Sequence, residues 1–151
     1  MTKKTLILLG IAILLAGLLA GCGGAAEEAA PVAADAALKI SGNVEAETGW
    51  AEADVKAMDT IDVESTNKDG ETSTYTGVPL NTLLGLAGVK DGATTLVFVA
   101  DDGYTVEVVL ADVQTCDNCI VAFRDQGGFI TIMPEFPGNT QVKGIVEIQV
   151  Q

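Results

Sequence analysis

Cys116 and Cys119, spaced as Cys-x-x-Cys, are the residues whose type and spacing best suit chemistry. A redox pair of this kind works when it opens a helix and a positive charge or dipole lowers the pKa of one thiol. Here Asp117 lies between the two cysteines, and no helix pattern follows them. We therefore expect a structural disulfide. Two alternatives stay open: thiol–disulfide exchange, and metal contact across a dimer.

A closed metal site within one chain is not expected. Two cysteines supply half the ligands of a structural zinc site, and the chain contains no His to complete it. The acidic residues also lack the spacing of an EF-hand calcium loop. Asp69 and Gly70 instead indicate a hairpin turn between two alternating runs. We expect no metal ligands and no catalytic residues.

The third cysteine, Cys22, ends a pattern typical of bacterial lipoproteins. Lys3 and Lys4 precede an apolar run over residues 6–19, and the sequence Leu-Ala-Gly-Cys occupies residues 19–22. This is an export signal whose final Cys accepts a lipid. An uncleaved membrane anchor is the alternative, although the run is shorter than the roughly 20 residues that span a bilayer. We expect Cys22 to be lipidated, which anchors a chain to a membrane without spanning it.

Three segments follow from this pattern. Residues 1–21 are the expected lipoprotein signal peptide. Residues 22–37 are rich in Gly, Ala and Glu, and have too few large apolar side chains to fold, so we expect a flexible tether. Residues 38–151 have the length of one ordinary domain.

The charge of the chain excludes several partners. Its formal net charge is −13, and removal of residues 1–21 would take away two lysines and no acid, leaving −15. Such a chain is a poor partner for nucleic acid and for anionic lipid. The acids are spread along the sequence, so we expect them to form a solvated surface.

The expected domain is organised around the junction at residues 75–84. A strand pattern ends at Gly77, Pro79 suits a first helical position, and Leu80, Leu83, Leu84 and Ala87 follow at helical spacing until Gly88. Two strand patterns come next, at residues 96–100 and 105–109, with a turn between them. Strands are also expected at residues 61–65, 71–76, 119–123 and 129–133. Eight or so strands and two short helices predict a β-rich α+β domain.

This order of elements resembles the molybdopterin-binding domain of the sulfite oxidase family of oxidoreductases. The similarity includes an opening strand at residues 38–45, a first short helix at 54–58 and a closing strand at 142–150. It covers nearly all of the expected domain. The resemblance implies the fold of that family. Molybdopterin is implied as a cofactor by the resemblance alone.

The sequence differs from that family at the positions that bind its metal and its cofactor. The family holds molybdenum through a Cys thiolate shortly before the junction, whereas no Cys lies between Ile61 and Gly77. Ser65 and Thr66 offer hydroxyls there, which are hard ligands and do not replace a soft thiolate. The family also uses Arg and His for phosphate and oxyanion groups. This chain has no His and a single Arg, Arg124.

Other polar residues are expected to be structural. Tyr104 opens a strand and is expected in the core. Asp101 and Asp102 are expected to be solvated turn residues. Arg124 is expected to form a salt bridge with Asp125 or a neighbouring acid, although as the only Arg it could instead hold an anionic ligand.

Together these patterns predict an extracytoplasmic lipoprotein, anchored in the cell envelope, whose domain has lost the molybdenum-ligating residues. We expect it to act as a binding or scaffolding module, with a small ligand or an envelope protein as partner. A molybdopterin-dependent oxidoreductase and a thiol–disulfide protein are the alternatives.

Overall fold

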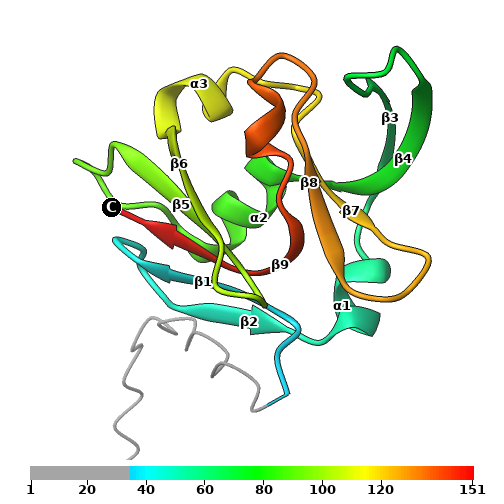
Figure 1. Ribbon diagram of the computed structural model, residues 1–151. Coiled ribbons are helices and arrows are strands. Elements are labelled where there is room, and N and C mark those ends of the chain that lie inside the picture. The colour runs from blue at the N-terminus through cyan, green and yellow to red at the C-terminus, as the bar shows by residue number, and fades with distance from the viewer. Residues whose placement is uncertain (1–34) are drawn as a thin grey trace, which may run out of the picture.

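A computed structural model describes residues 35–151 of the chain (Figure 1). The expected signal peptide lies outside the described residues, as does the expected tether apart from its last three positions. In chain order the elements are β1 (Leu38–Gly42), β2 (Thr48–Trp50), α1 (Glu52–Lys56), β3 (Ile61–Thr66), β4 (Thr72–Pro79), α2 (Leu80–Ala87), β5 (Thr95–Ala100), β6 (Thr105–Val109), α3 (Leu110–Gln114), β7 (Ile120–Phe123), β8 (Phe129–Ile132), the 3-10 turn η1 (Gly138–Thr140) and β9 (Lys143–Val150).

The described residues form a β-rich α+β fold, which confirms the predicted class. They contain three short α-helices rather than the two expected. The additional helix, α3, has five residues and no side-chain cap, so its sequence lacks the usual start signal. None of the helices in this part of the chain is long and apolar enough to cross a membrane.

β9 joins the two sides of the sheet. Its second half pairs in parallel with β1 and antiparallel with β5, while its first half pairs antiparallel with β8. Through β1 and β5, which flank its second half, the sheet continues to β2 and β6; through β8, which pairs with its first half, the sheet continues to β7, β4 and β3. Figure 1 shows the first group on the left and the second on the right, with α2 between them.

The junction between β4 and α2 differs in one detail from the sequence expectation. Pro79 has an extended backbone, with ψ at 134°, and precedes the helix instead of occupying its first turn. The helix ends as expected at Gly88, whose φ of 67° is left-handed. The predicted inward face is confirmed, because Leu80, Leu83, Leu84 and Ala87 are all buried.

Apolar side chains form two clusters of unequal size. The larger packs α2 and α3 against β1, β5 and β9, and includes Leu83, Phe98 and Ile148. The smaller contains Val63, Ile120, Ala122, Ile130 and Ile132, with Tyr75 packed against it. β7 separates the two clusters because successive side chains of a strand point to opposite faces: Val121 belongs to the larger and its two neighbours to the smaller.

The hairpin that joins β3 to β4 has the turn that the sequence predicted. The side-chain oxygen of Asn67 accepts hydrogen bonds from the backbone N–H groups of Asp69 and Glu71, at 2.9 and 3.0 Å. Gly70 supplies the positive φ, at 82°. The oxygen of Asn67 is therefore used to build a hairpin turn, as the sequence predicted.

Candidate functional site

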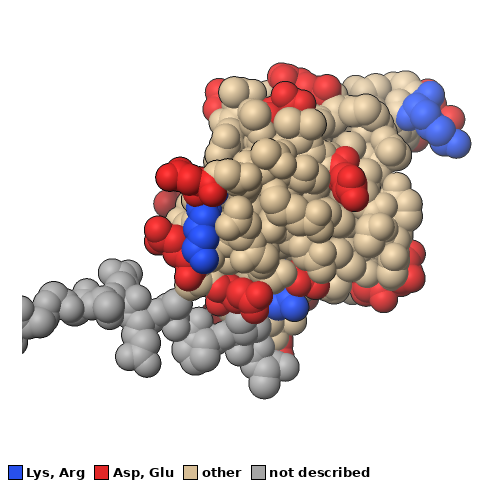
Figure 2. Space-filling model, turned by 90° about the vertical axis from the view of Figure 1, so that its left-hand side faces the viewer, with Lys and Arg blue, Asp and Glu red and all other residues tan. Residues whose placement is uncertain are grey.

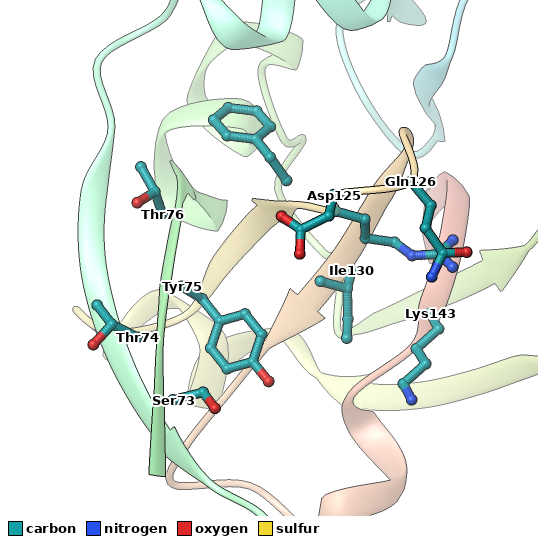
Figure 3. A pocket seen from close by; sticks show the side chains of 10 residues that line it. Ser73, Thr74, Tyr75, Thr76, Asp125, Gln126, Ile130 and Lys143 are labelled. Atoms are coloured by element: carbon teal, nitrogen blue, oxygen red, sulfur yellow. The ribbon is translucent and has the colours of Figure 1, made fainter.

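An open cavity of about 650 Å³ lies between β4 and the turn that joins β7 to β8. Its lining residues are Ser73, Thr74, Tyr75 and Thr76 of β4, Phe123, Arg124, Asp125 and Gln126 at the β7–β8 turn, Ile130 of β8 and Lys143 of β9. Figure 3 shows Ser73 and Tyr75 on one wall, with Ile130 and Lys143 opposite them. Hydroxyl groups, two cations and one carboxylate thus share one solvent-open cavity.

The cavity exists because β4 and β7 pair over a short distance and then separate. Gly77, Val78 and Pro79 pair with β7, while the earlier residues of β4 pair with β3 alone. At the point of closest approach a Cβ on Gly77 would lie 2.3 Å from the carbonyl oxygen of Val121. Glycine therefore permits the contact at the narrow end, and the wedge opens beyond it.

The two cations that line the cavity have no ion-pair partner among residues 35–151. Arg124 is half-buried and Lys143 is exposed. Apart from Lys3 and Lys4, every Lys and Arg of the chain lies in this part, so one third of its six cations face the same cavity. The expected salt bridge of Arg124 with Asp125 or a neighbouring acid is wrong for the described residues, because both side chains line an open cavity without forming an ion pair.

This placement contrasts with the rest of the surface. Figure 2 shows a face on which acidic side chains outnumber cations and most of the area is uncharged. Elsewhere among residues 35–151, Lys39 and Lys56 are paired with Glu147 and Glu52, while Lys68 and Lys90 form no ion pair. A guanidinium, an ammonium and hydroxyl donors are the groups with which proteins bind anions, so this cavity is the candidate site.

Ser65, which the sequence offers in place of a metal-ligating Cys, lies next to this cavity. It pairs across the hairpin with Ser73, one of the lining residues. Ser65 is buried, and its hydroxyl accepts a hydrogen bond of 3.1 Å from the side-chain amide of Gln141. The hydroxyl is therefore held within the protein's own hydrogen bonds.

Cys116 and Cys119 form a disulfide in the loop between α3 and β7. Both are buried in the larger cluster, with 5% and 1% of their surfaces exposed, and neither lines the cavity. The Asn81 side chain donates to the carbonyl oxygen of Cys116 at 3.4 Å, and the Leu80 backbone N–H donates to that of Cys119 at 2.9 Å. The bridged loop thus supports the first turn of α2.

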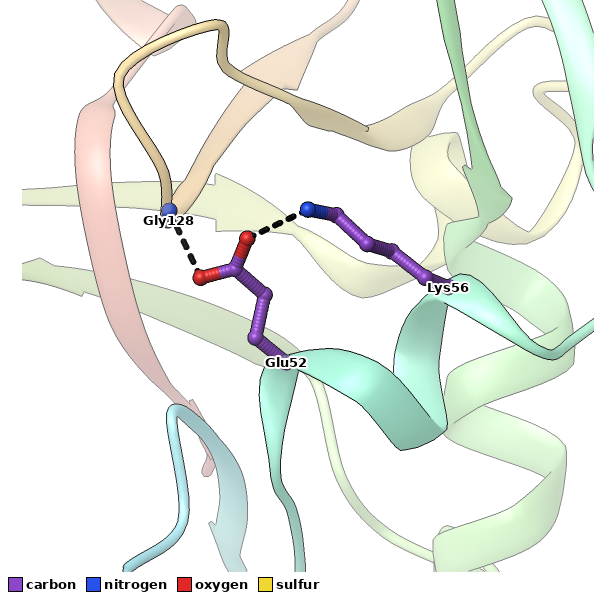
Figure 4. A network of polar contacts seen from close by, with 3 residues as sticks. All are labelled: Glu52, Lys56 and Gly128. Carbon is purple, nitrogen blue, oxygen red and sulfur yellow. Dashed lines mark hydrogen bonds and ion pairs between the residues drawn. The ribbon is translucent and has the colours of Figure 1, made fainter.

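Glu52 at the start of α1 reaches the far side of the β7–β8 turn (Figure 4). One carboxylate oxygen accepts a hydrogen bond of 3.1 Å from the Gly128 backbone N–H, and the other lies 2.6 Å from the Lys56 ammonium. The hydrogen bond from Lys56 and, to a smaller extent, the one from Gly128 hold the pKa of Glu52 below its usual value. Glu52 is therefore a charged acceptor at the base of the turn that carries Arg124.

Two other expectations have mixed outcomes. Tyr104 is not a core residue, because 46% of its surface is exposed and its hydroxyl donates to the carbonyl oxygen of Asn139 at 3.2 Å. Asp101 and Asp102 are exposed, as expected, and Asp102 accepts a hydrogen bond from the Tyr104 backbone N–H. Within residues 35–151, no group of three or more His, Cys, Asp or Glu side chains could hold a metal ion.

Sequence reasoning did not identify Ser73, Tyr75 and Lys143 as site residues. Tyr75 and Lys143 are 68 positions apart in the sequence, and only the path of β4, β8 and β9 brings them to one cavity. The usable signals were the run of hydroxyl residues from Thr72 to Thr76 and the presence of a single Arg.

Comparisons with known proteins agree on one fold. The family described as oxidoreductase molybdopterin binding domain matches residues 27–151. The sulfane dehydrogenase SoxCD from Paracoccus pantotrophus has a similar structure, with a TM-score of 0.63 and 20% sequence identity. The similar region covers 75% of this chain but 37% of the SoxCD chain. No curated protein sequence matches the chain.

Proposed function

Because the chain belongs to the family of oxidoreductase molybdopterin-binding domains but lacks a free thiolate at the matching site, we propose that it works as an anion-binding module anchored to a membrane. The observation that carries this proposal is the cavity between β4 and the β7–β8 turn. Two cations without ion-pair partners in the described chain line it, although the protein is strongly acidic.

The family implies a molybdenum cofactor, and the residues present do not fit the metal. Molybdenum in this family requires a soft sulfur ligand. Ser65 and Thr66 supply hydroxyl oxygens in the corresponding stretch, and Ser65 is already bonded to Gln141. The sulfur atoms of Cys116 and Cys119 are joined to each other and buried away from the cavity. The site therefore supports binding by cations and hydroxyls rather than metal-centred chemistry.

The cavity offers an anion two kinds of contact. The planar guanidinium of Arg124 suits two parallel hydrogen bonds to a carboxylate or phosphate, while Lys143 adds a compact charge. Asp125 is the one acid on the lining, so it disfavours highly charged ligands by direct repulsion. Acids farther away than about 10 Å are largely screened at ordinary salt. A small, singly or doubly charged ligand fits this balance.

The anchor is a separate part of the proposal. The sequence Leu-Ala-Gly-Cys at residues 19–22 supports lipidation of Cys22 and an extracytoplasmic location. A tether over residues 22–37 would then let the domain meet ligands or envelope proteins near the membrane surface.

Phosphate titration of the full-length chain in detergent micelles tests the binding site. We expect saturable shifts of backbone amide resonances at residues 73–76 and 124–128. Arg124→Met should raise the Kd about tenfold, since hydrogen bonds to charged groups contribute roughly 1.5–3 kcal/mol. Lys143→Met should have a smaller effect, and Lys90→Met, which removes an equal charge elsewhere, should have almost none. Shifts that do not saturate, or that occur away from the cavity, would overturn the site.

Metal analysis and lipid labelling test the remaining parts. Protein from a host that makes molybdenum cofactor should contain no stoichiometric molybdenum, and about one atom per chain would contradict the proposal. Cys22→Ser should abolish lipid labelling and leave an unprocessed precursor. A Cys22→Ser chain that still has the mature mass and carries lipid would show that the anchor is assigned to the wrong residue.

A further inference from the structure

The turn that carries Arg124 has few contacts of its own. Two internal hydrogen bonds close it, from the Gly127 N–H to the Arg124 carbonyl oxygen at 3.0 Å and from the Arg124 N–H to the Gly128 carbonyl oxygen at 3.1 Å. Gly127 and Gly128 both have positive φ, at 87° and 72°. Asp125 is exposed to solvent. A turn with two glycines and no buried side chain at its tip has many accessible conformations unless something outside it restricts them.

Two side chains of α1 supply that restriction (Figure 4). The Glu52 carboxylate accepts the Gly128 N–H, which no ladder bond uses. The Lys56 ammonium lies 5.9 Å from the centre of the Phe123 ring, at the opposite end of the turn, and Glu52 binds the same ammonium. Phe123 also packs against Phe129, with ring centres 6.2 Å apart. Both ends of the turn are thus fixed to one helix.

We infer that Glu52 is a positioning residue that holds the Arg124–Gly128 turn in the conformation that binds an anion. This inference rests on the proposed function, because the turn forms one wall of the proposed binding cavity. Glu52 is not among the residues that line the cavity, so it acts through the Gly128 backbone. Loss of this hold lowers the population of the binding conformation, and the apparent Kd rises in proportion.

For the same substitution at Glu52, a direct electrostatic effect and a positioning effect predict opposite changes in anion affinity. Glu52→Ala removes a negative charge near an anion site, so direct Coulomb effects alone would tighten binding. Positioning predicts weaker binding, because the Gly128 N–H loses its acceptor. Glu52→Gln removes the charge but keeps an oxygen that can accept this N–H, so it separates the two effects.

The full-length chain in detergent micelles serves for the binding test, with inorganic phosphate as the probe. We expect Glu52→Ala to raise the phosphate Kd about five- to tenfold. Glu52→Gln should stay within about twofold of the native Kd. Asp54→Ala is the matched control, since Asp54 is an exposed acid on the same helix without a side-chain bond to the turn. Its Kd should be unchanged or slightly lower.

Hydrogen–deuterium exchange of the peptide that spans residues 124–129 gives a readout that needs no ligand. In Glu52→Ala this peptide should exchange at least about fivefold faster than in the native chain, while a peptide from α2 should be unaffected. Native exchange in the turn together with native or tighter phosphate binding would overturn the inference. Faster exchange throughout the chain would also overturn it, since the role of Glu52 would then be general stability.

The two proposals fail in different ways. If the native chain does not bind phosphate at all, the proposed function is wrong. Exchange of residues 124–129 then still decides whether Glu52 positions the turn. If the native chain binds phosphate and Glu52→Ala has an unchanged Kd, the inference is wrong and the anion site stands.

Discussion

The strands β1 and β5 flank the second half of β9 and, with β6, pack against α2 and α3, whereas on the side reached through β8 the strands β4 and β7 separate after three residue pairs. The first side buries large side chains such as Phe98 and Leu83 completely. The second side has a smaller cluster with an open wedge beside it, and that wedge collects Arg124 and Lys143. One family fold thus combines a closed, stabilising half with an open half whose polar side chains remain available.

The comparison predicts the largest effect for core substitutions on the closed side. Leu83→Ala should lower the free energy of unfolding by about 4–5 kcal/mol, because Leu83 is fully buried within the larger cluster and its removal leaves a cavity there. Ile130→Ala should cost about 2 kcal/mol, since this side chain already borders the open cavity. Urea unfolding of both variants provides the measurement. Equal losses would show that the two halves are packed alike.

The narrow end of the wedge should tolerate no side chain. Gly77→Ala is expected to cost about 1–3 kcal/mol, because the new Cβ would lie 2.3 Å from a backbone oxygen that is fixed by strand pairing. Gly85→Ala on α2 is the control: a Cβ there meets no atom within 4 Å, so helix propensity should stabilise the protein by about 0.5–1 kcal/mol. Thermal unfolding of the pair separates a steric effect from a general effect of Gly replacement. A neutral Gly77→Ala would mean that β4 and β7 can move apart.

The disulfide should matter less than its burial suggests. Cys116 and Cys119 are three positions apart, so the ring restricts little of the unfolded chain. Replacing both with Ala should cost about 1–2 kcal/mol, below the roughly 2–4 kcal/mol typical of longer rings. The mass of alkylated protein before and after reduction shows whether the pair is oxidised. A pair found reduced in cells, or insulin reduction that Cys116→Ser abolishes, would favour thiol exchange over a structural role.

The smallest expected effect is the loss of folding stability at low pH. Burial alone would raise the pKa of Glu147, but bonds from Ser41 and Lys39 outweigh it, so the pKa of Glu147, like that of Glu52, lies below its usual value. Between the lowered and usual pKa the unfolded chain binds more protons than the native one. Both carboxylates therefore stabilise the fold above about pH 4.5, and this contribution is lost as pH falls through the lowered pKa.

Urea midpoints at about pH 7 and about pH 3 measure this effect. Glu147→Gln should reduce the difference between the two midpoints more than Glu52→Gln, because the Glu147 side chain is 18% exposed and that of Glu52 is 33% exposed. Identical pH dependence in the native chain and Glu147→Gln would contradict the assignment.

Much of the closed side could be predicted from the sequence. The pattern at Leu80, Leu83, Leu84 and Ala87 identified α2 and its buried face, and Gly88 identified its end. Local spacing suffices there, because a helix face and a terminating glycine are properties of neighbouring residues. α3 was missed since five residues without a cap give too little pattern, and tertiary packing of Leu110 and Val113 forms it.

The open side could be predicted only in part. Its strands were identified, but the wedge depends on where β4 stops pairing with β7, and no local pattern specifies that register. Arg124 was therefore assigned to a salt bridge although its side chain lines the cavity without an ion pair in the described chain. Tyr104 was placed in the core as an aromatic residue opening a strand, but it lies just before the edge strand β6 and 46% of its surface is exposed.

The central position of β9 has a consequence for how the chain acquires its fold. β9 follows every other described element in the chain, yet β1, β5 and β8 all pair with it, including the parallel pairs between Lys39 and Glu147 and between Gly42 and Val150. Contacts this distant in sequence require closure of a long loop, and their high contact order slows folding. Until β9 has been made, the edges of β1, β5 and β8 that it covers in the native sheet therefore stay unpaired.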